Sequence, residues 1–149
     1  MRQTRLLIVV STLALTIGVV AIVAGQDPTQ TPRNKFVVEL EKQIAGKEQQ
    51  PAEQVFKNIQ TFKGRPAIGV LRIMELAFVA NLGVDCSYCH DTERWDSDAK
   101  KPKQIARGMW TLRATAQDEV RRITGKADVP VTCYTCHKGQ PIPSFAPAR

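Results

Sequence analysis

The chain has 149 residues and a formal net charge of +7, from 21 basic and 14 acidic side chains. The basic residues are scattered apart from one run, KKPK at 100–103, which indicates a solvated surface rather than a docking face for an acidic partner. No stretch interleaves aromatic and basic residues as nucleic-acid platforms do, so nucleic acid is excluded as a partner.

The N-terminus carries an uncharged apolar run of 20 residues, from 6 to 25, shortly after two arginines. As a helix it would be about 30 Å long, which matches the hydrocarbon thickness of a bilayer. A cleavable signal peptide usually has a shorter apolar core of about 7–15 residues, although VAG at 23–25 is a passable cleavage site. Residues 1–25 are therefore predicted to be a signal-anchor or, alternatively, a signal peptide. In both cases Arg2 and Arg5 stay in the cytoplasm and the rest is exported to the periplasmic side of the inner membrane, either anchored there or soluble after cleavage.

The exported part is predicted to contain a tether and one domain. Residues 26–34, QDPTQTPRN, are polar and contain two prolines, which suits a short extended tether. Residues 35–149 form the single predicted domain. A domain of this size gains stability from a covalent staple or a large bound cofactor.

Apolar residues at helical spacing predict that this domain is mostly α-helical. The four predicted helices cover residues 34–48, 51–64, 67–83 and 103–125, each with a glycine at or near its end. Asn34 is the expected N-cap of the first helix, and Pro51 stands at a helix-entry position for the second. The fourth carries an amphipathic stripe of Ile105, Met109, Leu112, Ala116, Val120 and Ile123. Few or no strands are expected, because the only β-branched run, at 128–133, is short and contains Pro130.

All four cysteines and both histidines occur in two copies of one motif, CxxCH. The motif residues are Cys86, Cys89 and His90 in VDCSYCH and Cys133, Cys136 and His137 in VTCYTCH. A zinc site built from two CxxC knuckles normally separates them by about 15–20 residues, whereas 43 residues separate these two. A thioredoxin-like redox pair is expected beside a βαβ pattern, which is absent from the sequence. Structural disulfides are allowed in an exported protein but do not account for the histidines.

Covalent haem attachment accounts for every residue of both motifs. The two thiols of each motif add to the vinyl groups of a haem, and the histidine that follows presents its imidazole to the iron. The sequence therefore predicts two covalently bound haem c groups, with His90 and His137 as axial ligands. The second nitrogen of each imidazole ring is expected to donate a hydrogen bond to a backbone carbonyl or to water.

The ligand on the other side of each iron cannot be histidine, because both histidines are already used. Met74 and Met109 are the remaining soft neutral donors outside the N-terminal segment, and each lies on the apolar face of a predicted helix. A methionine in such a place is otherwise an ordinary core residue. Two interpretations stay open at this point: methionine ligation, which raises the potential and favours electron transfer, or an open iron suited to peroxide chemistry or ligand sensing.

The sequence from about Pro51 to Pro143 resembles the cytochrome c subunit of photosynthetic reaction centres. RIMELAFVANLGVDCSYCH is similar to the family's methionine-bearing helix that leads into a CxxCH motif, and VTCYTCHKGQPIP is similar to a later motif. The resemblance implies that Met74 lies opposite His90 and that Met109 lies opposite His137. Family members in purple bacterial reaction centres hold four haems in a longer chain, whereas this sequence contains two motifs.

The resulting hypothesis is a membrane-tethered, two-haem electron relay rather than an enzyme. Its partners are a redox protein that donates electrons and one that accepts them, and the resemblance implies a photosynthetic reaction centre as acceptor. The alternatives are an electron carrier of a respiratory chain and a haem peroxidase or sensor with one open iron.

Overall fold

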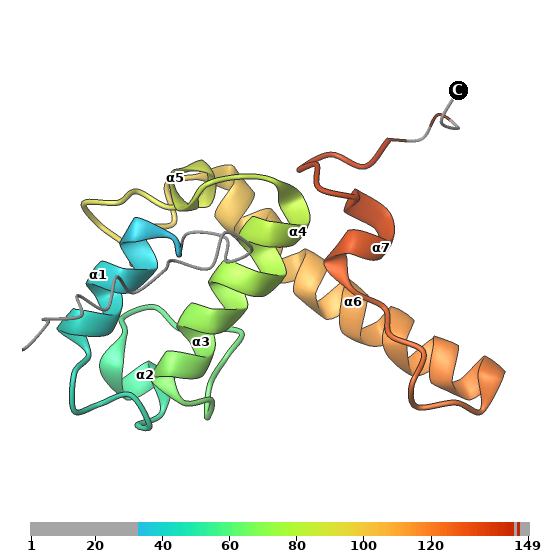
Figure 1. Ribbon diagram of the computed structural model, residues 1–149, viewed down its shortest axis with the longest axis horizontal. Helices are drawn as coiled ribbons and strands as arrows, with labels where there is room; N and C mark the ends of the chain where they lie inside the picture. Colours follow the sequence, from blue (N-terminus) through green and yellow to red (C-terminus); the bar gives the residue numbers. More distant parts are fainter. Residues whose placement is uncertain (1–32, 145, 147–149) are drawn as a thin grey trace, which may run out of the picture. The chain divides into compact units, whose positions relative to one another are not determined.

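The computed structural model describes residues 33–144 and 146, so the predicted signal-anchor at 1–25 and most of the tether lie outside the described residues. The helices are α1 Lys35–Gln43, α2 Ala52–Val55, α3 Ala67–Ile73, α4 Ala80–Leu82, α5 Cys86–Cys89, α6 Lys101–Thr124 and α7 Cys133–His137, with a π-helical segment η1, Met74–Val79, between α3 and α4 (Figure 1). Over this part of the chain there is no β-strand, only two isolated bridges, which confirms the mostly α prediction. None of its helices is both long and apolar enough to span a bilayer.

α1 begins where the sequence predicts and ends earlier. The side-chain oxygen of Asn34 accepts a hydrogen bond from the backbone N–H of Phe36 at 2.9 Å, which is the expected N-cap. The helix stops at Gln43, five residues before the predicted end, because the backbone leaves the helical conformation at Ile44. Val37 and Ile44 are buried against α3, so α1 is fixed by its apolar face.

The predicted second helix at 51–64 is wrong beyond its first turn. α2 has four residues, and the chain then forms a loop in which Asn58 adopts a φ of +61°. A backbone hydrogen bond of 2.8 Å from the N–H of Ala52 to the carbonyl of Arg65 closes the base of this loop. Phe62 is buried from within the loop. Long-range pairing and core packing therefore prevail over the local helical pattern.

The predicted third helix at 67–83 runs through α3, η1 and α4 and ends at Gly83 in the left-handed conformation, as expected. The π-helical middle is not indicated by the sequence. A π-helix has i→i+5 backbone hydrogen bonds in place of the i→i+4 bonds of an α-helix. Here the side-chain amide of Asn81 donates to the carbonyls of Leu76 and Ala77 at 3.1 and 2.9 Å. Segments of this kind are frequent at functional sites.

α6 has 24 residues and ends at Gly125 with a φ of +65°, as predicted. Its apolar stripe, however, is largely exposed, at Ile105, Met109, Leu112 and Ile123. The buried residues of the helix are Lys103 and Gln117, which lie on the opposite side at helical spacing. The helix therefore packs on the rest of the domain with the face that its sequence marks as the more polar one.

α7 lies against α4 through a close approach of two glycines. The N–H of Gly139 donates to the carbonyl of Asn81 at 3.1 Å, and a Cβ placed on Gly83 would lie 2.2 Å from the Gly139 carbonyl oxygen. The segment between α6 and α7 is held by Gln117, whose side-chain oxygen accepts from the N–H of Val131 at 2.7 Å. These contacts fix the second motif against the helix that precedes the first.

The core consists of two small clusters on either side of α3. One contains Val37, Ile44, Ala67 and Leu71. The other contains Ala52, Phe62 and Val70, with Ile59, Met74, Phe78 and Trp110 packed against it. The second cluster brings the predicted ligand Met74 and an aromatic side chain of α6 together.

Candidate functional site

A cavity of about 580 Å³ adjoins the first CxxCH motif. Met74, Cys86, Cys89 and His90 all line it, together with apolar side chains from α1, α3, η1, α6 and the loop at 56–62. Its volume falls in the range of about 300–1,000 Å³ that is usual for ligand and cofactor pockets. The structure thus brings together all four side chains that the sequence predicts for the first haem.

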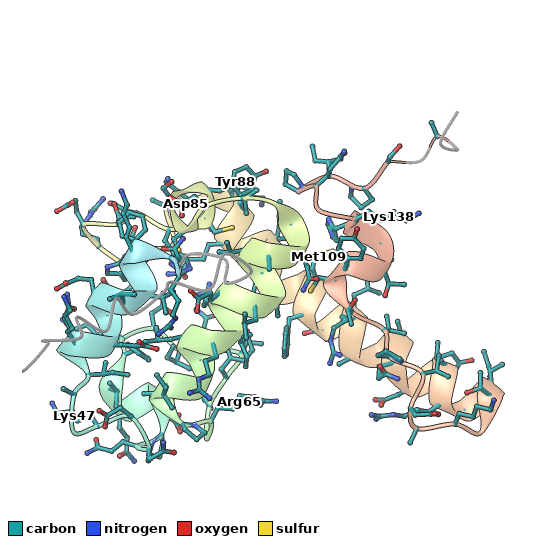
Figure 2. The ribbon with its side chains drawn as sticks, in the orientation of Figure 1. Lys47, Arg65, Asp85, Tyr88, Met109 and Lys138 are labelled. Carbon is teal, nitrogen blue, oxygen red and sulfur yellow. The ribbon has the colours of Figure 1, made fainter. Side chains whose placement is uncertain are left out.

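The first motif is presented by α5 as a single helical turn. Cys86 and Cys89 are three residues apart on it, so both thiols lie on one side of the turn. The start of this turn is tied to the start of α1, because the Asp85 carboxylate accepts a hydrogen bond of 2.8 Å from the Asn34 side-chain amide. Figure 2 shows Asp85 and Tyr88 at this turn.

Glu75, the residue that follows Met74, anchors the start of η1. The carboxylate of Glu75 accepts from the backbone N–H of Asn34 at 2.8 Å and from the Arg33 guanidinium at 3.1 Å. The same asparagine therefore connects η1, which begins at Met74, with the start of α5. Three short elements that line the cavity are fixed around one capping residue.

His90 is arranged as a neutral ring. Burial lowers its pKa below the usual range, against the opposite effect of a hydrogen bond to the Trp95 carbonyl. Nδ1 lies 3.4 Å from that carbonyl oxygen, which can only accept, so Nδ1 carries the proton and Nε2 keeps its lone pair. The Nζ of Lys103 donates to the same carbonyl at 2.9 Å and fixes the loop.

The cysteine thiols of the first motif are protonated and unbridged. Burial raises the pKa of both Cys86 and Cys89, and the nearby Asp85 carboxylate adds to the effect at Cys86. All four cysteines of the two motifs are free in the described residues. The structural disulfides that are the alternative to haem attachment are therefore not present in this part of the chain.

The second motif borders a smaller cavity, of about 320 Å³. Of the side chains predicted for the second haem, Cys133 lines this cavity, whereas Cys136, His137 and Met109 do not. Cys136 is exposed, and Met109 on α6 is 38% exposed (Figure 2). The structure therefore does not gather the second predicted set around one cavity as it does the first.

His137 nevertheless repeats the local arrangement of His90. Its Nδ1 lies 2.9 Å from the backbone carbonyl of Gln140, which can only accept a hydrogen bond. Both motif histidines thus have Nδ1 within hydrogen-bond distance of a backbone carbonyl, as expected. The turn that carries His137 is started by Thr132, whose N–H donates to the Thr135 hydroxyl at 3.0 Å.

Trp110 forms a wall that the two cavities share, because its side chain lines both. Its ring lies 4.9 Å from that of Phe62 in an edge-to-face pair and 5.9 Å from that of Phe78 in a stacked pair. The guanidinium of Arg113 lies over the same ring at 5.0 Å. Trp110 is thus the residue that the linings of the two cavities have in common.

The model of the family described as photosynthetic reaction centre cytochrome C subunit matches residues 14–147 of the chain. The chain belongs to this family. It is 32% identical over 96 residues to the photosynthetic reaction center cytochrome c subunit of Thermochromatium tepidum, an alignment that covers 64% of this chain and 23% of the relative. It is 33% identical over 101 residues to the subunit of Rubrivivax gelatinosus (strain NBRC 100245 / IL144), covering 62% and 25%. The alignments thus span about a quarter of these curated relatives.

Membership of a cytochrome c family implies covalently bound haem c, and the first site fits such a group. Its cavity holds two thiols one turn apart, a neutral imidazole with a free Nε2 and a thioether. The second site offers the same motif and the same histidine arrangement. Beside it, the Nε of Arg113 is buried without a hydrogen-bond partner, which suits an anionic group.

Sequence reasoning missed the charged residues of both cavities. Lys103 belongs to the KKPK run, the exception to the scattered basic residues; it is 9% exposed and bonded to the loop after the first motif. Arg107 lines the first cavity and pairs with Asp98 at 2.9 and 3.0 Å. Arg113 lines the second. Lys103 and Arg107 lie on the side of the fourth predicted helix opposite its apolar stripe, so their position is an available signal. Arg113 is four residues after Met109, a member of the stripe, so its position gives no such signal.

Proposed function

We propose that the chain is a two-haem c-type cytochrome that passes electrons at the periplasmic face of the inner membrane. The observation that carries this proposal is the cavity of about 580 Å³ that Met74, Cys86, Cys89 and His90 line together. Family membership supports haem c as the bound group, and the second CxxCH motif supports a second copy of it.

Each motif holds one haem in this proposal, through two thioether bonds and a histidine ligand. The proposed attachment residues are Cys86 and Cys89 for the first haem and Cys133 and Cys136 for the second, with the axial pairs His90 and Met74, and His137 and Met109. The carbonyl that accepts from each Nδ1 keeps the ring in the tautomer that a ligand needs.

Haem iron, when bound, supplies a one-electron couple between its ferric and ferrous states. The chain contributes two neutral ligands, a thioether and an imidazole, and a combination of this kind raises the potential. Apolar side chains of the two core clusters exclude water from the first site. With both axial positions held by the chain, no substrate position is left, so the proposal is an electron carrier and not an enzyme.

The proposed partners are a redox protein that donates electrons and a photosynthetic reaction centre that accepts them. The names of the curated relatives support the reaction centre as acceptor. Residues 1–25 are proposed to tether the domain to the membrane, with a soluble periplasmic form after cleavage as the alternative. Delivery of electrons to a respiratory chain is the competing assignment of the acceptor.

A second candidate function applies to the second haem alone. Met109 is 38% exposed and does not line the cavity that Cys133 lines, which favours an iron with one open position there. Such an iron would bind small exogenous ligands or react with peroxide, as in a sensor or peroxidase.

The test is a haem count followed by a carbon monoxide difference spectrum of the purified protein. Peptide mass spectrometry is expected to find one haem on the peptide with Cys86 and Cys89 and one on the peptide with Cys133 and Cys136. The reduced protein is expected not to change its spectrum with carbon monoxide. Carbon monoxide binding by one haem would support the open-iron function for it, and peptides without haem would contradict the proposal.

The tether and the acceptor are tested on native membranes. N-terminal sequencing distinguishes an intact anchor from a chain that starts after Gly25. Flash oxidation of a reaction centre is expected to be followed by oxidation of this cytochrome at a rate that depends on its concentration. Reduction of a terminal oxidase instead, with no response to the flash, would assign the chain to respiration.

A further inference from the structure

Lys103 is a buried lysine whose side chain ends among three oxygen atoms. Its Nζ lies 2.9 Å from the carbonyl oxygen of Trp95, 2.8 Å from that of Ser97 and 3.3 Å from a carboxylate oxygen of Asp98. Three acceptors match the three donors of an ammonium group, so the side chain carries its charge in a fixed position. A buried charge of this kind is retained only where polar partners surround it.

The carbonyl oxygen of Trp95 is shared between this ammonium group and the histidine of the first motif. It lies 3.4 Å from Nδ1 of His90 and 2.9 Å from Nζ of Lys103. N–H···O hydrogen bonds usually measure about 2.7–3.2 Å, so the imidazole forms the longer and weaker of the two contacts. A charged donor bonds more strongly than a neutral one and draws the electron density of the oxygen toward itself. The carbonyl is therefore a poorer acceptor for His90 than it would be without the lysine.

The second motif has the corresponding carbonyl without a cation on it. Nδ1 of His137 lies 2.9 Å from the carbonyl oxygen of Gln140. No other donor reaches that oxygen from the residues that the structure describes. The two motifs thus share the contact between imidazole and carbonyl, and only at the first does a buried ammonium group bind the same oxygen.

We propose that Lys103 weakens the hydrogen bond of His90 and thereby raises the potential of the haem at the first motif. The inference rests on the proposed function, because it requires a haem with His90 as a ligand. A strong hydrogen bond from Nδ1 makes the imidazole more basic, which favours ferric iron. Hydrogen bonding behind a ligand is one of the means by which a protein sets the potential of a haem. Lys103 is a positioning residue in this proposal, because it acts through the Trp95 carbonyl and not on the iron.

The experiment makes two measurements on the complete two-haem protein and its variants. A redox titration gives the potentials, and nuclear magnetic resonance of the ferrous protein with 15N-labelled histidine gives the shift of each Nδ1 proton, which moves downfield as its hydrogen bond strengthens. Lys103→Met removes the ammonium group and keeps an apolar stem. Lys103→Gln keeps a neutral donor at the buried position and replaces Lys103→Met if that variant does not fold. Cys133→Ser with Cys136→Ser, which leaves one haem, assigns the signals and potentials.

Lys101→Met is the matched control. Lys101 is exposed, lies two residues away on α6 and lines neither cavity, so the substitution removes the same charge without touching the Trp95 carbonyl. In Lys103→Met the Nδ1 proton of His90 is expected to move downfield and the potential of the first haem to fall. Lys103→Gln should cause smaller changes in the same directions, and Lys101→Met neither. The His137 signal and the second potential should stay unchanged in all three.

Three outcomes in Lys103→Met would overturn the inference. An unchanged first potential would show that the lysine does not tune this haem. A lower potential without movement of the His90 proton would show that the lysine acts only as a nearby charge. Equal movements of the His90 and His137 protons would show a general structural change. Peptide mass spectrometry separates these results from failure of the proposed function, which is contradicted only if the peptide with Cys86 and Cys89 carries no haem.

Discussion

The two CxxCH motifs share one residue pattern but have different structural surroundings. The first borders a cavity that all four predicted side chains line, together with residues of both core clusters and of α6. The second stands on α7, where one of its four predicted side chains lines a cavity and Met109 is 38% exposed. The motif therefore sets the local chemistry of thiols and imidazole, whereas distant parts of the chain contribute the shell around it. Three pairs of variants and one single variant test how far this difference extends.

The largest effect is expected from removing the attachment cysteines of one motif at a time. Cys86→Ser with Cys89→Ser should lose one haem and destabilise the domain by about 4 kcal/mol or more, the upper end of mutational effects, to which loss of a bound metal group belongs. Cys133→Ser with Cys136→Ser should lose the other haem at a smaller cost, because the two core clusters do not involve α7. Haem peptides and thermal unfolding by circular dichroism give both quantities. Equal losses of stability would remove the proposed difference between the sites.

Replacing each methionine in turn compares a proposed ligand that packs against the core with one that is partly exposed. Met74→Ala should cost about 2 kcal/mol of stability, the lower end of the range for truncating a methionine to alanine, because Met74 is partly buried and packs against the second core cluster. Met109→Ala should cost less than about 1 kcal/mol, since the side chain is partly exposed. Each variant should lower the potential of one haem and remove half of the sulfur-to-iron absorption band. Retention of the full band in both variants would contradict methionine ligation.

The contact between α4 and α7 is tested by two glycines with the same backbone conformation. Gly83→Ala places a Cβ 2.2 Å from the Gly139 carbonyl oxygen, at a φ of +63°. We expect a loss of about 2–4 kcal/mol from the left-handed conformation and the clash together. Gly125→Ala, at φ +65° with no atom within 4 Å, should lose only about 1–2 kcal/mol. Chemical denaturation measures both. A similar loss in the two variants would mean that α7 moves away freely.

The smallest effect concerns the ion pair beside the first cavity. Hydrogen bonds from the Arg107 guanidinium, followed by the Asn58 side chain, hold the pKa of Asp98 well below its usual value of 3.8. A lowered pKa in the folded state means that the pair stabilises the protein above pH 3.8 and that this contribution is lost as the pH falls through the lower native value. Asp98→Asn should therefore flatten the acid side of the stability profile. An unchanged acid midpoint in the variant would show that the pair contributes nothing.

Features with local causes could be predicted from the sequence. The cap at Asn34 and the helix ends at Gly83 and Gly125 follow from side-chain bonding and from the freedom of glycine at positive φ. The grouping of Met74 with the first motif also follows, because one continuous helical segment leads from the methionine to the cysteines and no long loop intervenes.

The rest depends on contacts that no short stretch reveals. Residues 56–62 do not form the helix that their pattern predicts. Phe62 is buried instead, and the backbone hydrogen bond between Ala52 and Arg65 closes the loop at its base. The π-helical turn at η1 has no signal of its own in the residue types. The burial of Lys103 arises from which side of α6 faces the domain, and the apolar stripe of that helix indicates the opposite side. The unpaired Nε of Arg113 belongs to a side chain that bonds to the carbonyl of Val131, a contact between distant parts of the chain.

The Trp110 side chain lines both cavities. A substitution there changes the volume of both cavities at once, and the edge-to-face contact with Phe62 passes the change on to the core. The two candidate haem sites therefore cannot be reshaped independently through this position. A substitution of residue 110 that enlarges or shrinks one cavity therefore also changes the other.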